Sequence, residues 1–161
     1  MSEHQNMEYK TNWHDDHLKV VCGFANAKGG TLYIGKDDAG KVTGVADYKK
    51  LMEDLPNKIH DLLGVMAEVR LKKKTGLYFI EIVVPPYSVP ISFRGRYYYR
   101  SGSVKKELIG NSLNEFLLKK SGKTWDDVLE LGAKIADIDK KSVDQFVKSA
   151  KKVGRFPGNE K

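Results

Sequence analysis

The chain has 161 residues, of which 40% are hydrophobic and 10% aromatic. This length supports one ordinary hydrophobic core, so we expect a single domain with a C-terminal appendage. No apolar run is long enough to span a bilayer, and the polar residues 1–6 lack the apolar segment of a secretory signal. The composition therefore predicts a soluble, cytoplasmic protein without a membrane partner.

The charge balance is basic, with 28 Lys and Arg against 21 Asp and Glu and a formal net charge of +7. Cations bound along phosphates release condensed counterions, so this balance favours a polyanionic partner. The excess lies in residues 70–74, in the arginines of residues 94–100 and in the lysines of the C-terminal third. A solvated surface has a similar composition, so charge alone does not decide between the two interpretations.

Helical spacing of apolar residues predicts a helix over residues 15–27, ended by Gly29-Gly30. Residues 31–35 and 41–45 are rich in β-forming side chains and flank a turn, which predicts a hairpin. A second helix is expected over residues 48–63, where Pro56 has to be accommodated as a kink or a break.

Further strands are expected at residues 66–73 and 77–84, and a last hairpin joins residues 91–93 to 97–100 around Arg94-Gly95-Arg96. The pattern turns helical from Ser112, breaks at residues 121–122 and resumes at Ser142. These elements predict an α+β fold with a mixed, mostly antiparallel sheet, two helices packed on it and a C-terminal helical extension. The expected divisions are a domain over 1–108, the extension over 109–154 and a tail over 155–161, and the abrupt end suggests a piece of a longer protein.

Three sequence features have ordinary structural explanations. Cys22, the only cysteine, lies in an apolar stretch and is expected to be a buried thiol, and the four histidines lack an accompanying ligand cluster, so no structural metal is predicted. Residues 35–41 match the first seven positions of a Walker A loop, but Val42 stands where a hydroxyl should ligate magnesium. A hairpin turn is expected there, and ATP binding is not.

Carboxylates near the N-terminus and after the first predicted strand indicate a second possible chemistry. Converging carboxylates hold magnesium or manganese, which can activate water for phosphodiester cleavage beside a basic surface. The candidates are Glu3, Glu8 and either Asp37 or Asp38. By residue type alone, scattered surface acids explain them better.

The segment of residues 94–100 carries alternating arginines and tyrosines. Strand alternation places four of its side chains on one face: Arg94, Arg96, Tyr98 and Arg100. Such a face could follow phosphates and stack a base, as single-strand and RNA binders do. The alternative is an edge strand protected from aggregation by its charges, and both interpretations stay open for the arginines. Tyr97 and Tyr99 are expected in the core.

Three stretches together resemble a known family: residues 3–10 as E-x-x-x-x-E-[YF]-K, residues 22–45 with Phe-Ala-Asn-x-x-Gly-Gly followed by a strand and Asp-Asp, and residues 95–103. They are similar to the Schlafen-type Alba-like domain (Schlafen AlbA_2, formerly called divergent AAA) over about residues 3–105. The resemblance implies an α+β fold and nucleic-acid binding, commonly in bacterial transcriptional regulators or helicase-related proteins.

The resemblance also implies residue roles. In vertebrate Schlafens a related module acts as a metal-dependent nuclease on structured RNA with two glutamates and an aspartate, which correspond here to Glu3, Glu8 and, as first choice, Asp37. Lys10 would then be a nearby phosphate contact. Those nucleases pair two modules, whereas this chain has one, so a homodimer could restore the pair. For Asn26 and Gly29-Gly30 a structural role in the helix-to-strand turn is favoured.

The leading prediction is a DNA- or RNA-binding domain of a transcriptional regulator that needs no cofactor for binding, with Lys10, Arg94, Arg96, Tyr98 and Arg100 as contacts. The first alternative is an endonuclease that uses Mg²⁺ or Mn²⁺ at Glu3, Glu8 and Asp37. The second alternative is a protein-interaction or dimerisation module whose basic face is incidental. Non-enzymatic binding is favoured over catalysis.

Overall fold

The computed structural model describes residues 6–122, 144–145 and 148–149. The chain divides into two units, Met1–Thr124 and Trp125–Lys161. The four described residues of the second unit are helical and exposed, within the segment where a helix was predicted to resume. The predicted boundaries at 108 and 154 stay predictions. No helix within the described ranges combines the length and apolar character that crossing a membrane requires.

A four-stranded sheet forms the first layer of the first unit, with the strand order β1-β2-β4-β3. Its strands are β1 (Met7–Lys10), β2 (Gly30–Ile34), β3 (Glu68–Lys74) and β4 (Leu77–Val84). The β1–β2 pair is parallel and the other two pairs are antiparallel. The predicted hairpin partner at residues 41–45 is wrong, because only a single bridge, Lys36 to Val42, forms there. The neighbour of β2 comes instead from β1, a short polar segment with little strand signal.

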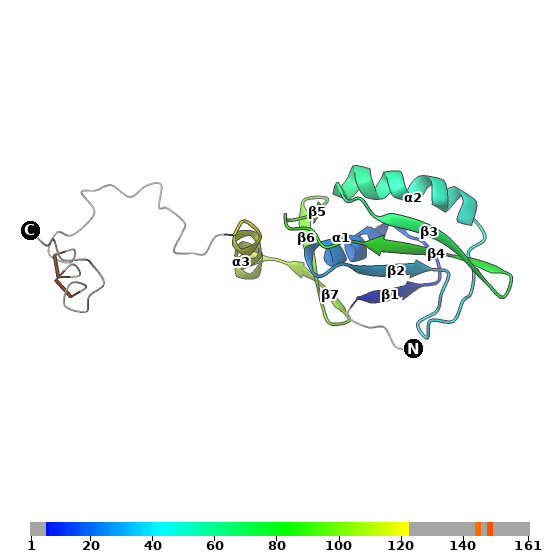
Figure 1. Cartoon of the computed structure of the whole chain (residues 1–161), viewed down its shortest axis with the longest axis horizontal. Helices are drawn as coiled ribbons and strands as arrows, with labels where there is room; N and C mark the ends of the chain where they lie inside the picture. The colour runs from blue at the N-terminus through cyan, green and yellow to red at the C-terminus, as the bar shows by residue number, and fades with distance from the viewer. Residues whose placement is uncertain (1–5, 123–143, 146–147, 150–161) are drawn as a thin grey trace, which may run out of the picture. The chain divides into compact units, whose positions relative to one another are not determined.

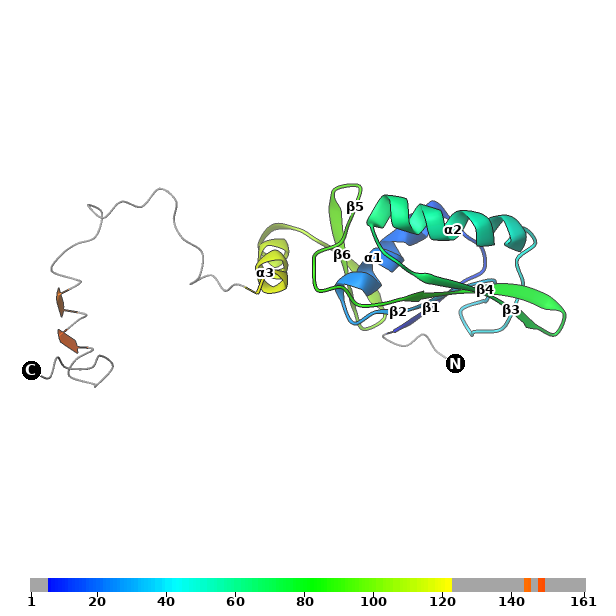
Figure 2. The ribbon, with the colours of Figure 1, turned by 45° about the horizontal axis from the view of Figure 1, so that its top comes forward.

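Two helices lie on the same side of this sheet, as Figure 2 shows for α1 (Leu18–Asn26) and α2 (Tyr48–Leu63). A 3-10 turn, η1 (Asp15–His17), leads into α1. Pro56 lies on the exposed side of α2 and does not interrupt the helix. Its ring costs one backbone hydrogen bond, which the apolar stripe of α2 outweighs.

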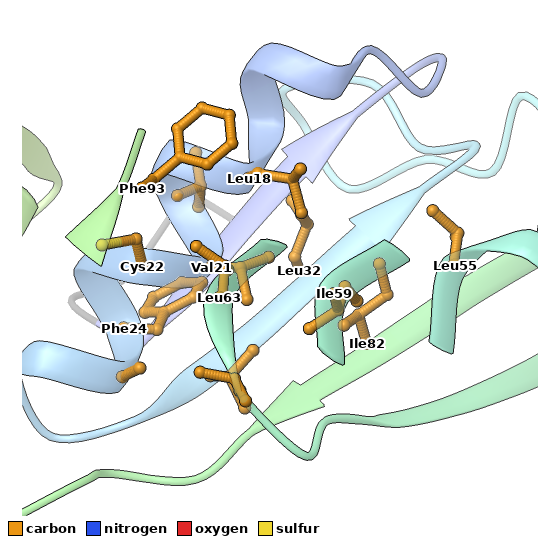
Figure 3. Packing of buried hydrophobic residues seen from close by; sticks show 14 of the residues in the cluster. Leu18, Val21, Cys22, Phe24, Leu32, Leu55, Ile59, Leu63, Ile82 and Phe93 are labelled. Atoms are coloured by element: carbon orange, nitrogen blue, oxygen red, sulfur yellow. The ribbon is translucent and has the colours of Figure 1, made fainter. Parts of the chain in front are cut away.

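The core lies between the sheet and the helices. The inward side chains of β2 and β4 are buried. Four are completely buried, namely Leu32, Ile34, Ile80 and Ile82, and Val84 is almost completely buried. They pack against side chains at helical spacing, including Val21 and Phe24 of α1 and Leu55, Ile59 and Leu63 of α2 (Figure 3). Burial of each such side chain contributes about 1.5–3 kcal/mol, so this layer accounts for most of the stability of the unit.

A second, three-stranded antiparallel sheet lies beside α1 and is followed by a helix (Figure 1). Its elements are β5 (Ser92–Phe93), β6 (Arg96–Ser101) and β7 (Val104–Leu108), and the helix is α3 (Gly110–Lys120). Arg94 and Gly95 form the two-residue turn with φ of 52° and 75°, the left-handed geometry that suits a tight hairpin. The predicted α+β class with mostly antiparallel pairing is confirmed, with two sheets in place of one.

Helix α1 is the layer shared by the two sheets. Eight of its nine residues are buried, and Lys19 is the exception. A helix that is apolar all round has to be covered on all sides, and here the four-stranded sheet and the hairpin sheet provide the cover. Gly23 lies against β6, and a Cβ on it would make an ordinary contact, 3.6 Å from the backbone nitrogen of Arg100.

Asn26 fastens the end of α1 to the hairpin sheet. Its buried side-chain amide donates to the carbonyl oxygens of Ile91 and Tyr98, both at 2.8 Å, and its oxygen accepts the Ile91 amide at 2.7 Å. The Cys22 thiol donates to the same Ile91 carbonyl at 3.2 Å, and burial raises the pKa of Cys22 to about 11. The predicted structural roles of both residues agree with this placement.

Replacing Asn26 by alanine should lower the free energy of unfolding by about 3 kcal/mol, because it leaves buried backbone groups of Ile91 and Tyr98 without partners. Urea unfolding followed by circular dichroism measures the change. Asn57→Ala is the matched control, since Asn57 is exposed on α2 and alanine favours the helix. Equal stability of the two variants would contradict the role given to Asn26.

Candidate nucleic-acid interface

Strand β6 presents one face to α1, and this face is not the expected one. Tyr98 and Arg100 are 5% and 2% exposed, so the prediction that they lie on an open nucleic-acid-binding face is wrong. Alternation correctly grouped them, but their face meets α1. Arg100 is therefore buried and makes no surface contact available to a phosphate.

The opposite face of β6 carries Tyr97 and Tyr99. Both were expected in the core, but they are only half-buried and lie outside the main core. Both rings contact Phe116 of α3, at centroid distances of 6.4 and 6.0 Å. Helix α3 thus covers the face that the sequence assigned to the interior. The alternation of residues within β6 does not show that α3 covers this face, because α3 follows later in the sequence.

Arg100 is held by an ion pair that spans the two sheets. Its guanidinium donates to Glu8 Oε2 at 2.6 Å and to the Met7 carbonyl at 3.0 Å, and it lies 4.8 Å from the centroid of the Phe24 ring. Lys10 binds the other carboxylate oxygen of Glu8 at 2.7 Å. Burial raises the pKa of Glu8, but the hydrogen bonds and charges of Lys10 and Arg100 outweigh burial and hold the pKa below 4.5.

A group of cations surrounds the edge of the Tyr98 ring on the surface that β6 and β7 share with the start of α1. We call it the hairpin surface and define it by Lys19, Arg94, Arg96, Tyr98 and Lys105. The amino groups of Lys19 and Lys105 lie 5.8 and 5.9 Å from the Tyr98 centroid. Arg94 and Arg96, with Lys19, line a shallow depression of about 190 Å³ beside it.

The hairpin surface is only partly neutralised by acids. Asp16 binds Lys19 at 2.5 Å, and Glu107 lies 3.4 Å from Arg96. The nearby Asp15 is taken by Lys58, at 2.7 Å. The four cations of the surface therefore face two paired carboxylates.

His17, the last residue of η1, has a lowered pKa. Burial, followed by the positive charges of Lys10 and His14, lowers the pKa of His17 from 6.5 to about 4, and Lys105 contributes in the same direction. Asp16 opposes the shift and does not reverse it. A neutral His17 at physiological pH leaves the positive charge to the lysines and arginines around it.

Of the three predicted metal ligands, the structure describes Glu8 and Asp37. Glu3 lies outside the described residues, and both oxygens of Glu8 are bound by cations. Asp37 Oδ1 accepts the backbone amides of Ala39 and Lys41 at 3.0 and 2.9 Å, so it closes its own loop. Within residues 6–122, no three His, Cys, Asp or Glu side chains are placed to share a metal ion. Glu8 is thus engaged by Lys10 and Arg100, and one oxygen of Asp37 is engaged by its own loop.

The loop that resembles a Walker A sequence is a tight turn. The Asp37 amide donates to the Lys41 carbonyl, and the Gly40 amide donates to the Asp37 carbonyl. Gly35 has a φ of 95°, and a Cβ there would lie 2.7 Å from Val45. No helix begins after this loop until Tyr48, so its amides are directed at its own carbonyls and carboxylate.

Sequence reasoning missed Lys19 and Lys105. Lys19 could have been found as the one cation on an otherwise apolar helix. Its place beside Tyr98 depends on how the hairpin sheet packs on α1, which the sequence pattern does not show. Lys105 lies on β7, a strand that the sequence did not predict because its side chains are mostly exposed.

These features define a small α+β domain with a basic surface around a β-hairpin. The sequence matches the Schlafen, AlbA_2 family over residues 3–109, which is most of the first unit. The chain belongs to this family. No curated protein matches the chain significantly.

One solved structure shows a similar fold, and a second aligns less closely. The DIP2311 protein from Corynebacterium diphtheriae aligns with a TM-score of 0.56 and 18% identity, over 89% of this chain and 33% of that protein. The N-terminal domain of an ATP-dependent DNA helicase RecG-related protein from Nitrosomonas europaea aligns with a TM-score of 0.48 and 24% identity, over 69% of this chain and 88% of that domain. This chain thus spans a third of the corynebacterial protein.

Removal of the Arg100 cation should destabilise the fold. Arg100→Met leaves a buried Glu8 with Lys10 alone and should lower the free energy of unfolding by roughly 3 kcal/mol. Arg94→Met, at the exposed hairpin turn, should change it little. Urea denaturation compares the two, and a similar loss in both variants would mean that the ion pair does not tie the sheets.

Stability should fall as the pH drops from about 6.5 to about 4, because His17 stays neutral in the folded chain while its unfolded form takes up a proton. The depressed pKa means that this stabilisation is present above 6.5 and is lost towards 4. His17→Gln retains an acceptor for the His14 amide and should flatten this part of the profile. Melting temperatures measured across this range test it, and a slope unchanged in the variant would contradict it.

Proposed function

We propose that this chain is a nucleic-acid-binding domain and that the hairpin surface contacts the phosphate backbone. The observation that supports it most directly is the set of four cations around Tyr98, which carboxylates pair only in part. Lysine and arginine on such a surface gain affinity by counterion release. Membership of the Schlafen, AlbA_2 family supports the same class of ligand.

The finer role we propose is that of the nucleic-acid-binding part of a regulator. The edge of the Tyr98 ring is flanked by cations and little of the ring is exposed, so contacts are expected mainly with phosphates and less with bases. Phosphate contacts fix position and carry no sequence information by themselves. We therefore expect weak sequence preference from this surface.

The nuclease alternative gains no support from the placement of Glu8 and Asp37. A test with Glu8→Ala would also be ambiguous, since it removes the buried partner of Arg100 and should unfold the chain. Asp37→Asn is a cleaner variant, because an amide oxygen can still accept the loop amides. Cleavage of RNA that needs Mn²⁺ and is lost in this variant would favour the nuclease.

Replacing Arg94 and Arg96 by alanine should weaken binding to a labelled oligonucleotide and reduce the slope of log K against log salt by about 2, if each arginine contacts one phosphate. Fluorescence anisotropy over a series of salt concentrations measures this. Lys49→Ala with Lys50→Ala removes the same charge from exposed positions in the first turn of α2.

The control should lower affinity only slightly and leave the slope almost unchanged. These lysines lie at the far end of a 16-residue helix, whose length is about 24 Å, from the end that approaches the hairpin. Equal effects of the two pairs would mean that net charge, and not the hairpin surface, drives binding. Absence of binding at low salt would favour a protein-interaction module.

A further inference from the structure

The face of the four-stranded sheet that is turned away from α1 and α2 carries its own arrangement of aromatic rings and cations. Strand register places Tyr9, Tyr33, Glu81 and Arg70 in one row across all four strands, and Phe79 beside Lys72 in the next. These residues alternate with the inward side chains Ile34, Ile80 and Ile82, so they lie on the outer face. We call this the outer face.

Lys36 lies against the aromatic part of the outer face. Its amino group is 3.9 Å from the centroid of Tyr33, 4.8 Å from that of Phe79 and 5.5 Å from that of Tyr9. Burial lowers the pKa of Lys36, the positive charge of Lys74 lowers it further, and only Glu81 opposes them. Lys74 lies on the same face as Phe79, because it pairs with Leu77, two residues before Phe79 on β4.

The carboxylate of Glu81, on the same face as Lys36, already has three partners. Glu81 accepts the Tyr33 hydroxyl at 3.2 Å, and it also lies 3.3 Å from Arg70 and 3.9 Å from Lys72. Arg70 is held in addition by Glu68, at 2.6 Å. Among the described residues, no carboxylate lies within ion-pair distance of Lys36 or Lys74.

The cations of β3 are regularly spaced along the border of this face. Arg70, Lys72 and Lys74 alternate on an edge strand whose side chains are mostly exposed. Alternate residues of a strand are about 6.7 Å apart, a spacing of the same order as that of successive phosphates along a nucleic-acid strand. Lysines on an edge strand also prevent sheet-to-sheet aggregation, but that role does not account for Lys36, which comes from the loop after β2.

We propose that the outer face is a second phosphate-backbone site, in which Lys36, Lys72 and Lys74 hold backbone phosphates of a nucleic acid. An anion between Lys36 and Lys74 removes the repulsion between them, and the rings under Lys36 limit competing water. The outer face lies on the side of the four-stranded sheet that is turned away from the helices. The hairpin surface is formed by β6, β7 and the start of α1. The chain therefore has two separate phosphate-binding surfaces, and this inference shares only the ligand class with the proposed function.

The test uses the full chain and a labelled single-stranded oligonucleotide. Lys36→Gln with Lys74→Gln should weaken binding about ten-fold and lower the salt slope by about 2. The same loss should appear when the pair is introduced into the Arg94→Ala, Arg96→Ala variant. Lys49→Gln with Lys50→Gln is the charge-matched control and should have little effect.

The outcomes separate the two sites. An unchanged salt slope in Lys36→Gln, Lys74→Gln, or an equal loss in the control, overturns the outer-face site. A loss in this pair without a loss in the hairpin variant leaves the outer face standing and overturns the hairpin surface. Circular dichroism verifies that each variant is folded.

A measurement on the unaltered chain avoids dependence on variant folding. Amide and lysine side-chain NMR signals of residues 36 and 72–74 should shift when the oligonucleotide is added. Inorganic phosphate, titrated separately, should shift them only at much higher concentration. Shifts with inorganic phosphate but none with the oligonucleotide would assign the site to small phosphates and overturn the backbone proposal.

Discussion

Burial of α1 between two sheets is the constraint on which the rest of the first unit depends. Eight of the nine helix residues are buried, so both sheets have to lie against it. Two sets of buried polar interactions fix the position of the hairpin sheet. Asn26 binds the backbone of Ile91 and Tyr98, and Glu8 forms an ion pair with Arg100. Buried polar groups without partners are costly, so these interactions favour one arrangement of the hairpin sheet against α1.

This arrangement decides what the surface can do. Because Arg100 and Tyr98 face α1, the cations that the hairpin surface offers to a ligand are Arg94 and Arg96 at the hairpin and Lys19 and Lys105 beside it. Glu8 pairs with both Arg100 and Lys10, so this carboxylate contributes to the position of the hairpin sheet and to the local charge. Fold stability and the character of the basic surface thus rest on the same few side chains.

The sequence predicts the local elements well where a regular pattern covers a whole element. Helix α2 and strand β4 have the predicted bounds, and β3 differs only at its ends, since apolar periodicity and turn residues determine them. Strands β1 and β7 escaped prediction, because their side chains are polar and their pairing depends on distant partners.

The candidate site was harder to predict than the fold. Alternation correctly grouped Arg96, Tyr98 and Arg100 on one face of β6, but the direction of that face depends on Asn26 and Glu8, which lie far away in sequence. The neutralisation of Arg100 by a carboxylate 92 positions earlier leaves no local signal. Arg94 and Arg96 remain candidates because a tight turn keeps them exposed.

The most direct test of the central claim is a titration of the isotopically labelled full chain with a short oligonucleotide, followed by amide NMR. We expect large shift changes at residues 15–19, 93–98 and 104–107, in addition to those at residues 36 and 72–74, with smaller changes along α2, and their loss at high salt. Changes confined to α2 or to residues beyond 122, with those three segments unaffected, would contradict the assignment of the hairpin surface as the nucleic-acid interface.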